Sequence, residues 1–304
     1  MYDIIVVGGG PAGMTAALYA LRNGKTALVL EKNGFGGQIT HSPKVENWPG
    51  TARMSGNEYA DAFLEQILDQ GAEVDLTEVV RVEKADGCLR VITEDGEEKE
   101  AKAVILATGV KHRMLGLPGE EDLVGEGISY CAVCDGDFYK GKTVCVAGGG
   151  NSALQEAILL ASKCAHVTML QDLPSFTGEQ KLQEVLFARD NVSALTGVRI
   201  TDVTLDENAQ MTGVTVRKAD GETETVPCDG LFVAIGLIPE NEAFAGLAEL
   251  NQWGYFDSGE SCETKTPGVY VAGDCRSKGV RQLTTAVADG ATAALAACRY
   301  IDGL

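Results

Sequence analysis

The sequence lacks several features that would place the chain in a common functional class. It has no surplus of basic residues, because 25 lysines and arginines stand against 44 aspartates and glutamates, a formal net charge of −19. Such a charge opposes non-specific binding to nucleic acid and docking on an anionic membrane. No apolar run is long enough to span a bilayer, and no basic segment precedes the first apolar run, so we expect no secretory signal.

Histidines and paired cysteines are also scarce. The three histidines, at positions 41, 112 and 166, form no H-x₃₋₅-H pair, and C-x-x-C occurs only at Cys131 and Cys134. A structural zinc site needs a second pair of ligands, so this motif favours redox chemistry and we expect no metal site. The nine cysteines are an odd, scattered set, which argues against a secreted disulfide framework and for a reducing cytoplasm.

The segment from Cys131 to Asp135 carries the clearest chemistry in the sequence. Two thiols separated by two residues can close into a small, readily exchanged disulfide. An acid directly behind them can supply or take the proton that the exchange requires. The candidate catalytic residues are therefore Cys131, Cys134 and Asp135.

The chain contains an internal repeat. An apolar strand, a glycine turn and a helix begin in the segment 2–13, and the same design returns at 143–153. Each copy closes on a similar strand that ends in glycine, and each carries a β-meander before that strand. The first copy is longer, and we assign its extra residues to a loop at 35–57. This pattern predicts an α/β fold with two Rossmann-like, doubly wound domains.

The end of the sequence belongs most economically with the first copy. A strand is expected at 269–272 and an Ala-rich helix at 284–300. The second domain is then inserted within the first. We predict one domain made of residues 1–113 and 241–304, and a central domain of residues 114–240 that carries the dithiol. One helix start is well marked, since Ser55 and Glu58 form the pattern of a capping box.

The first glycine turn has the context of a dinucleotide-binding site. Gly8-x-Gly10-x-x-Gly13 follows a strand and opens a helix, and Glu31 ends the next strand. Glycines let the backbone approach a pyrophosphate, the helix N-terminus favours its charge, and the acid accepts from ribose hydroxyls. Asp274, behind Gly273, offers a carboxylate to a ribityl hydroxyl. Together these features indicate FAD.

With these motifs, the chain resembles the low-molecular-weight thioredoxin reductases of the FAD-dependent pyridine nucleotide-disulfide oxidoreductase class, essentially from end to end. The most specific segments are Glu-Asn-Trp-Pro-Gly at 46–50 and the dithiol run. The resemblance implies a homodimer whose central domain presents its disulfide in turn to the flavin and to a thioredoxin-like protein. It also implies that Cys134 faces the flavin and that Cys131 attacks the partner disulfide. The expected cofactor-binding residues are Gly8, Gly10, Pro11, Ala12, Gly13, Glu31, Gly37, Gln38, Asn47, Ala107, Thr108, Gly109, Gly273, Asp274, Arg281 and Gln282.

The second glycine turn departs from the members of that family that use NADPH. Those members carry a His-Arg-Arg-x-x-x-Arg pattern that holds the 2′-phosphate, whereas the matching positions here are Gln171, Asp172, Leu173 and Thr177. A carboxylate at this place repels a 2′-phosphate and no arginine offsets it, so the sequence argues against NADPH. Two alternatives stay open. Either Asp172 accepts from the ribose of NADH, or a protein donates the electrons.

We favour the protein donor, because the chain looks similar to thioredoxin reductases of anaerobic bacteria that take electrons from ferredoxin. The net charge opposes docking of an acidic ferredoxin, but we expect a local basic patch from the segments 111–113 and 276–281. The predicted function is a flavin-dependent thioredoxin-disulfide reductase. The alternatives are NADH or NADPH as donor, an oxidase that passes electrons from dithiols to oxygen, and a flavin–dithiol redox sensor without turnover.

Overall fold

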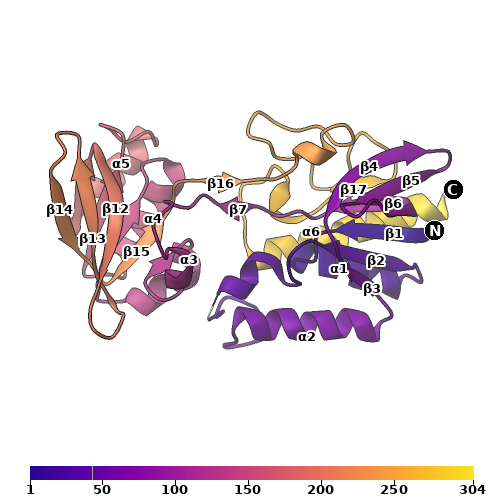
Figure 1. The fold of residues 1–304 in the computed structure, drawn as a ribbon, viewed down its shortest axis with the longest axis horizontal. Coiled ribbons are helices and arrows are strands. Elements are labelled where there is room, and N and C mark those ends of the chain that lie inside the picture. Colours follow the sequence, from indigo (N-terminus) through magenta and orange to yellow (C-terminus); the bar gives the residue numbers. More distant parts are fainter. Residues whose placement is uncertain (43) are drawn as a thin grey trace. The chain divides into compact units, whose positions relative to one another are not determined.

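The computed structural model describes residues 1–42 and 44–304; Pro43, within the loop expected at 35–57, lies outside the described residues. The chain divides into two compact units, residues 1–111 with 238–304 and residues 112–237 (Figure 1). The expected domain boundaries fall within a few residues of these limits. The two connecting segments, β7 (Lys111–His112) and β16 (Leu237–Ile238), pair with each other.

The first unit is built on a seven-stranded sheet. Its order is β3-β2-β1-β6-β5-β4, and β17 also pairs with β6. Parallel pairing joins β1, β2, β3, β6 and β17, whereas β4, β5 and β6 form an antiparallel meander. The strands are β1 (Tyr2–Val7), β2 (Ala27–Glu31), β3 (Glu73–Leu76), β4 (Val79–Ala85), β5 (Cys88–Thr93), β6 (Glu98–Leu106) and β17 (Val269–Val271).

Side chains of this sheet point alternately to its two faces, so the sheet contributes to two cores, one of which it shares with the helices. Ile4 and Val6 on β1 belong to a core shared with the three helices, whereas Ile5 and Val7 belong to the opposite core. The expected capping box is present at the start of α2, where Ser55 and Glu58 exchange hydrogen bonds. The helices are α1 (Pro11–Arg22), α2 (Gly56–Asp69) and α6 (Leu283–Asp302), and the 3₁₀ turns are η1 (Gly37–His41), η4 (Glu242–Phe244) and η5 (Gly273–Cys275).

The second unit repeats the parallel sheet and adds a separate meander. Its five strands run β11-β10-β9-β15-β8, all parallel, and β12, β13 and β14 form an antiparallel sheet. The parallel strands are β8 (Ile128–Ser129), β9 (Thr143–Ala147), β10 (His166–Gln171), β11 (Val192–Thr196) and β15 (Gly230–Val233). The meander strands are β12 (Val198–Leu205), β13 (Met211–Lys218) and β14 (Thr223–Pro227). The predicted pair of Rossmann-like folds with meanders is confirmed.

Alternation along β9 also separates two cores in this unit. Val144 and Val146 pack with the helices, whereas Cys145 and Ala147 pack with the meander. The helices are α3 (Ala132–Asp135), α4 (Asn151–Ala161) and α5 (Gln180–Phe187), and the 3₁₀ turns are η2 (Glu121–Leu123) and η3 (Gly136–Tyr139). Within residues 1–42 and 44–304, no helix has both the length and the apolar composition that a membrane crossing needs.

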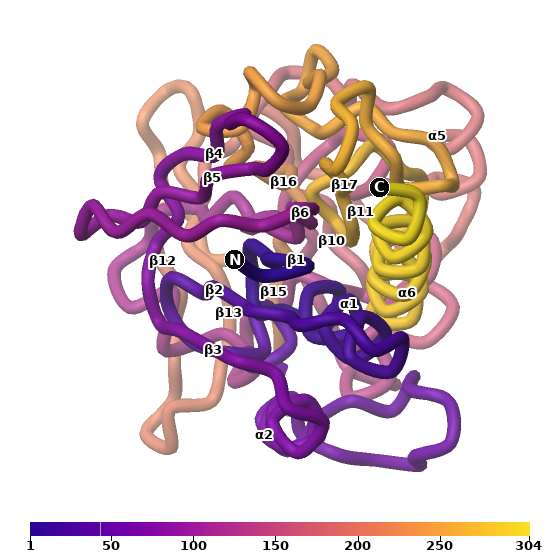
Figure 2. The backbone as a smooth tube through the Cα atoms, turned by 90° about the vertical axis from the view of Figure 1, so that its right-hand side faces the viewer, coloured from indigo at the N-terminus to yellow at the C-terminus, as the bar shows by residue number. Residues whose placement is uncertain are grey.

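Helix α6 packs directly on α1, and Gly290 allows the close approach (Figure 2). A Cβ atom at Gly290 would lie 2.1 Å from the carbonyl oxygen of Ala12. Helix propensity alone would make Gly290→Ala stabilising by about 1 kcal/mol. Overpacking in a dense interface costs about 1–3 kcal/mol, and here the obstacle is rigid backbone.

Rigid backbone places the overpacking cost at the upper end of its range, so after the propensity gain we expect Gly290→Ala to lower the free energy of unfolding by about 2 kcal/mol, measured by chemical denaturation. Thr292→Ala, on the same helix, is the control and should change it by less than about 0.5 kcal/mol. An unchanged free energy of unfolding for Gly290→Ala would show that α1 and α6 can move apart without loss of stability.

Candidate active site

The first glycine turn is shaped for the approach of another molecule to the backbone. Gly8 has a φ of 109°, and a Cβ atom there would lie 2.3 Å from the carbonyl oxygen of Ala107. Helix α1 begins at Pro11 behind Gly10, which provides no side-chain cap. The first N–H groups of the helix therefore remain available for an anion.

Glu31 lies at the edge of this turn, as expected for a ribose-binding acid. Its Oε2 accepts the backbone N–H of Gly9 at 2.7 Å, and its Oε1 accepts that of Asn33 at 2.9 Å. The carboxylate is thereby fixed at the end of β2. Each oxygen has a second lone pair for a hydroxyl donor.

A second loop approaches the same turn. The backbone N–H of Gly36 donates to the carbonyl oxygen of Gly9 at 2.9 Å, and Gly37 lies close to the Cα atom of Gly10. Gln38 follows in η1. These residues were predicted from separate motifs, and the fold brings them to one place at the carboxyl ends of β1 and β2, where open α/β sheets bind ligands.

The closing strand adds Ala107, Thr108 and Gly109 to this edge. The Thr108 hydroxyl donates to Asn241 Oδ1 at 2.8 Å. The Asn241 amide in turn donates to the carbonyl oxygens of Gly254 and Cys275, both at 2.9 Å. Asn241 is fully buried and no sequence motif had singled it out. It ties the closing strand to the segment that carries Asp274.

Asp274 has a half-buried side chain, and its buried Oδ1 faces Lys278. Burial raises its pKa, and the Lys278 ammonium, 3.2 Å from Oδ1, partly offsets this effect. Among the described residues, no well-directed hydrogen bond reaches Oδ1. Gly273 packs against Ala12 at the first turn, since a Cβ atom on Gly273 would lie 2.8 Å from that side chain. A buried acceptor beside the dinucleotide turn fits a sugar-alcohol hydroxyl of FAD.

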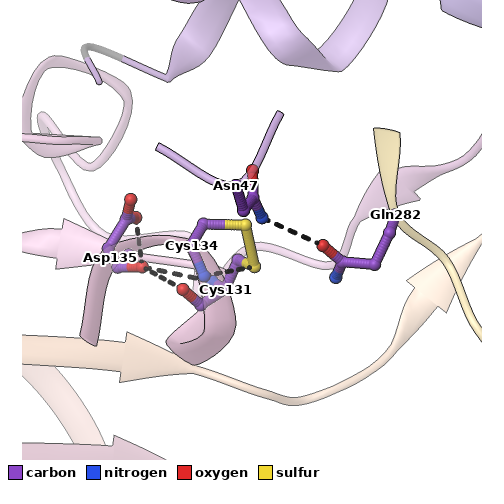
Figure 3. The surroundings of a disulfide bond; sticks show 6 residues. Asn47, Cys131, Cys134, Asp135 and Gln282 are labelled. Atoms are coloured by element: carbon purple, nitrogen blue, oxygen red, sulfur yellow. Dashed lines mark hydrogen bonds between the residues drawn. A yellow bond between two sulfur atoms is a disulfide. The ribbon is translucent and has the colours of Figure 1, made fainter. Parts of the chain in front are cut away.

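The last two expected flavin residues hold the start of α6. Arg281 donates to the carbonyl oxygen of Asp274 at 3.2 Å and lies over the ring of Tyr255, 4.3 Å from its centroid. Gln282 is the N-cap of α6, and its Oε1 accepts the Asn47 amide at 3.3 Å (Figure 3). Arg281 is thus linked to the Asp274 backbone, and Gln282, the next residue, is linked to Asn47.

A buried ion network supports this group and corrects one sequence-based expectation. Arg276 makes two hydrogen bonds of 2.8 Å to Asp289, and Lys278 lies 3.0 Å from the same carboxylate. Burial raises the pKa of Asp289, but the hydrogen bonds of Arg276 and the charge of Lys278 outweigh it and hold that pKa below its ordinary value. Lys111 is paired with Glu240 at 2.9 Å.

The expected basic patch at 111–113 and 276–281 is contradicted at Arg276 and Lys278, which are paired with Asp289 inside the first unit. Arg276 is 3% exposed and its guanidinium is neutralised by a carboxylate that the sequence pattern had not connected with it. Such a pair is packed inside the unit and offers no charge to a docking protein.

The dithiol lies at the start of α3 in the second unit. Cys131 and Cys134 form a disulfide, with their Cα atoms 5.3 Å apart (Figure 3). Cys131 is the N-cap residue, and its Sγ accepts the backbone N–H of Cys134 at 3.2 Å. The helix N-terminus favours negative charge on this sulfur and lowers the energy of its thiolate. Val133, between the cysteines, is 55% exposed, so the short helix presents a surface to solvent.

Asp135 ends the same short helix and is held by Ser129. The Ser129 hydroxyl donates to Asp135 Oδ2 at 2.6 Å, and its oxygen accepts the backbone N–H of Cys131 at 3.1 Å. Burial raises the pKa of Asp135, and the hydrogen bond from Ser129 partly offsets this. Asp135 Oδ1 is buried and has no hydrogen-bond partner in the described residues. A carboxyl group in this state binds its proton more tightly than an exposed one.

The second glycine turn has the same backbone arrangement as the first but lacks an acid at the position equivalent to Glu31. The backbone N–H of Gly148 donates to the carbonyl oxygen of Leu170, as that of Gly8 donates to Leu30, so Gln171 occupies the place of Glu31. The buried Gln171 amide lies against Gly149. A neutral amide thus replaces the ribose-binding carboxylate.

The remaining positions of the NADPH pattern carry no cation. Asp172 is exposed beyond the end of β10, and Leu173 is 47% exposed. The Thr177 hydroxyl donates to the carbonyl oxygen of Gly149 at 3.3 Å. No group at these three positions attracts a 2′-phosphate.

The other cysteines are free thiols. Six of these seven are buried, including Cys145 and Cys298, and Cys88 is half-buried. Within the described part of the chain, no group of three or more histidine, cysteine, aspartate or glutamate side chains is arranged to hold a metal ion.

Comparison with known proteins agrees with this site. Residues 2–290 match the family described as pyridine nucleotide-disulphide oxidoreductase. A protein of Clostridium pasteurianum, described as the 34.2 kDa protein in rubredoxin operon, is 40% identical over 302 residues, which are 99% of this chain and 97% of that protein. The thioredoxin reductase of Bacillus subtilis is 36% identical over 308 residues, covering 100% of this chain and 96% of its own.

A solved structure shows the same fold from end to end. The thioredoxin reductase from Streptococcus pyogenes MGAS5005 matches with a TM-score of 0.95 at 35% identity and covers 100% of this chain and 99% of its own. The chain therefore belongs to the pyridine nucleotide-disulphide oxidoreductase family, as a flavin-dependent disulfide oxidoreductase of the low-molecular-weight thioredoxin reductase class.

Proposed function

We propose that the chain reduces the disulfide of a thioredoxin-like protein through Cys131 and Cys134, and that its electrons come from reduced ferredoxin rather than from NADPH or NADH. When bound in the first unit, FAD supplies the two electrons that open the enzyme disulfide. The residues proposed to hold it are those of the first glycine turn, Glu31, the Gly37 loop, the closing strand and Asp274. The single observation that carries the donor assignment is the second glycine turn, where Gln171 replaces the acid and no cation replaces the arginines.

Reduction of the partner disulfide proceeds by two thiol–disulfide exchange steps. The Cys131 thiolate attacks one sulfur of the partner disulfide, so that a mixed disulfide forms and the other partner sulfur leaves as a thiolate. The Cys134 thiol then loses its proton and attacks the Cys131 sulfur, which releases the second partner thiolate and restores the enzyme disulfide. The N-cap position stabilises the Cys131 thiolate. Asp135 gives a proton to a departing sulfur and takes one from Cys134.

The donor assignment is supported by two features. NADPH needs cationic hydrogen-bond donors for its 2′-phosphate. NADH needs a carboxylate that accepts from its ribose hydroxyls. Asp172 lies past the ribose position and is exposed, which weakens the case for NADH. A relative of 40% identity is named for a rubredoxin operon, which links it to a protein electron carrier.

The proposed location is a reducing cytoplasm, and the proposed oligomeric state is a homodimer. Seven free thiols are consistent with a reducing cytoplasm. A homodimer is proposed from the resemblance to thioredoxin reductases. Sedimentation of the purified holoenzyme measures its mass directly.

The donor proposal predicts the outcome of an anaerobic half-reaction. The oxidised holoenzyme is mixed separately with NADPH, NADH and reduced ferredoxin, and the flavin absorbance is followed. We expect rapid bleaching with ferredoxin and none with either nucleotide. As a gain-of-function control, the triple variant Asp172→Arg, Leu173→Arg, Thr177→Arg should acquire measurable affinity for NADPH. Rapid bleaching of the unmodified enzyme by NADPH would overturn the assignment.

The proton role of Asp135 predicts a separate result. Asp135→Asn should retain its flavin but lose about 10²–10⁴-fold in the rate of thioredoxin reduction, because proton transfer at sulfur is lost. Because burial raises the pKa of Asp135, the remaining activity should also lose the pH dependence that titration of this carboxyl group imposes. Turnover of an electron donor with thioredoxin as acceptor measures both effects.

Asp137→Asn is the matched control for this variant. Asp137 lies two residues further on, with its side chain 69% exposed in an ion pair with Lys163. This change should leave turnover within about twofold, since exposed ion pairs contribute little. Equal activities of Asp135→Asn and Asp137→Asn would remove Asp135 from the mechanism.

A further inference from the structure

Lys278 faces two carboxyl groups of the first unit at once. Its ammonium lies 3.0 Å from Asp289 Oδ2 and 3.2 Å from Asp274 Oδ1. Asp289 belongs to α6, whereas Asp274 belongs to η5 and Lys278 to the loop that follows it. The side chain of Lys278 is 7% exposed. Because the cation is enclosed between the loop and the helix, solvent and salt screen its charge only weakly.

The position of Lys278 is fixed from the side of α6. Its ammonium donates to Asp289 Oδ2 at 3.0 Å and to the hydroxyl oxygen of Thr285 at 3.3 Å. Asp274 Oδ1, on the other side, is buried and accepts no well-directed hydrogen bond within residues 1–42 and 44–304. The cation therefore compensates the charge of Asp274 and leaves the lone pairs of Oδ1 for a hydroxyl donor.

Asp289 also holds the loop that carries Asp274. Its Oδ2 accepts the backbone N–H of Gly273, directly before Asp274, at 3.1 Å. Arg276 donates to both of its carboxylate oxygens at 2.8 Å. One buried carboxylate of α6 thus binds the loop at Gly273, at Arg276 and at Lys278, and this arrangement keeps the Lys278 ammonium beside Asp274.

The proton affinity of Asp274 depends on the charges around it. Burial raises the pKa of Asp274, and the charge of Lys278 lowers it. The charge of Arg281 lowers it further, whereas that of Asp289 raises it. The other titratable side chains on this loop and on the elements packed against it are Cys275 and Arg276, Tyr255, Asp257 and Glu260 on the preceding segment, Tyr19 and Arg22 on α1, and Cys298, Arg299, Tyr300 and Asp302 on α6.

We propose that Lys278 is a positioning residue for the flavin, which is held by Asp289 and keeps the Asp274 carboxylate ionised while leaving its Oδ1 lone pairs for a ribityl hydroxyl of FAD. The inference rests on the proposed assignment of Asp274 to FAD. A proton on Oδ1 removes the acceptor that the hydroxyl needs. Without Lys278, Asp274 keeps that proton to a higher pH. Lys278 therefore extends the retention of FAD toward acidic pH.

The test is the affinity of the holoenzyme for FAD as a function of pH. The purified holoenzyme is diluted in series from neutral to mildly acidic pH and ultrafiltered. The free FAD in the neutralised filtrate is measured by its fluorescence, which gives the dissociation constant. Circular dichroism at each pH shows that the chain is folded. This readout needs neither thioredoxin nor an electron donor, so it stands apart from the test of the donor.

We expect the wild-type affinity to fall as the pH falls, because Asp274 takes up a proton. Lys278→Gln removes the cation, so its fall should begin about one pH unit higher. On the acidic side Lys278→Gln should bind FAD about tenfold more weakly than the wild type, and at neutral pH the two should agree. Lys265→Gln, the same change in an exposed ion pair with Glu249, should reproduce the wild-type profile. Superimposable profiles for the wild type and Lys278→Gln, or an equal loss at every pH, would overturn the proposal.

Asp274→Asn distinguishes this proposal from the flavin assignment itself. The amide does not ionise, so we expect weaker binding of FAD and no fall on the acidic side. Wild-type affinity of Asp274→Asn throughout would remove Asp274 from the flavin site and overturn both the assignment and the proposal. Weaker binding by Asp274→Asn, together with a wild-type profile for Lys278→Gln, would overturn the proposal alone.

A double variant covers the case in which Lys278→Gln does not fold. Asp274→Asn with Lys278→Met removes both partners, so neither charge is left without the other. Because Lys278 acts through Asp274, the double variant should bind FAD within about twofold of Asp274→Asn. A much weaker affinity of the double variant would show that Lys278 supports FAD by another route, and the proposal would be wrong.

Discussion

The contact between Gly13 and the carbonyl oxygen of Gly8 is the constraint on which the first unit depends. A Cβ atom at Gly13 would lie 1.9 Å from that oxygen, so only glycine lets α1 begin this close to the end of β1. The approach brings the free N–H groups of α1 to the edge of the sheet and places Ala12 against Gly273. The Asp274 carboxyl group is thereby held beside the dinucleotide turn. The flavin site is the product of backbone packing as much as of its polar side chains.

The two units show how one backbone frame serves two purposes. In the first, the acid at the end of β2 is fixed by the turn and suits a ribose. In the second, the equivalent position is an amide, and the chemistry has moved to α3, which rests on the helix that follows the turn. There Asp135 ends the dithiol helix, with one buried carboxyl oxygen that has no hydrogen-bond partner in the described residues. Burial raises the pKa of this carboxyl group and so favours its protonated form.

Local patterns in the sequence predicted those structural features that depend only on residues close together in the chain. The repeat, the meanders, the capping box at Ser55 and the dithiol at a helix start all follow from short-range spacing. The pairing of Arg276 with Asp289 does not, because it depends on how α6 packs on η5, and a run of basic residues was mistaken for a surface patch. Ser129 was missed for the same reason. It is an ordinary polar residue in the sequence, and only the fold brings it to the dithiol.

Burial of the other cysteines limits unwanted exchange between their thiols and disulfide substrates. An enzyme that makes and breaks S–S bonds on each cycle exposes its own spare thiols to mispairing with its substrates. Here six of the seven are buried, and burial raises the pKa of Cys164, Cys262, Cys275 and Cys298. Because only the thiolate attacks a disulfide, these sulfurs are both sterically shielded and chemically inert. Of the described residues, only Cys88 offers a partly accessible spare thiol. Selectivity in thiol exchange is therefore a property of the whole hydrophobic interior, and substitutions that loosen the core would create side reactions far from the dithiol.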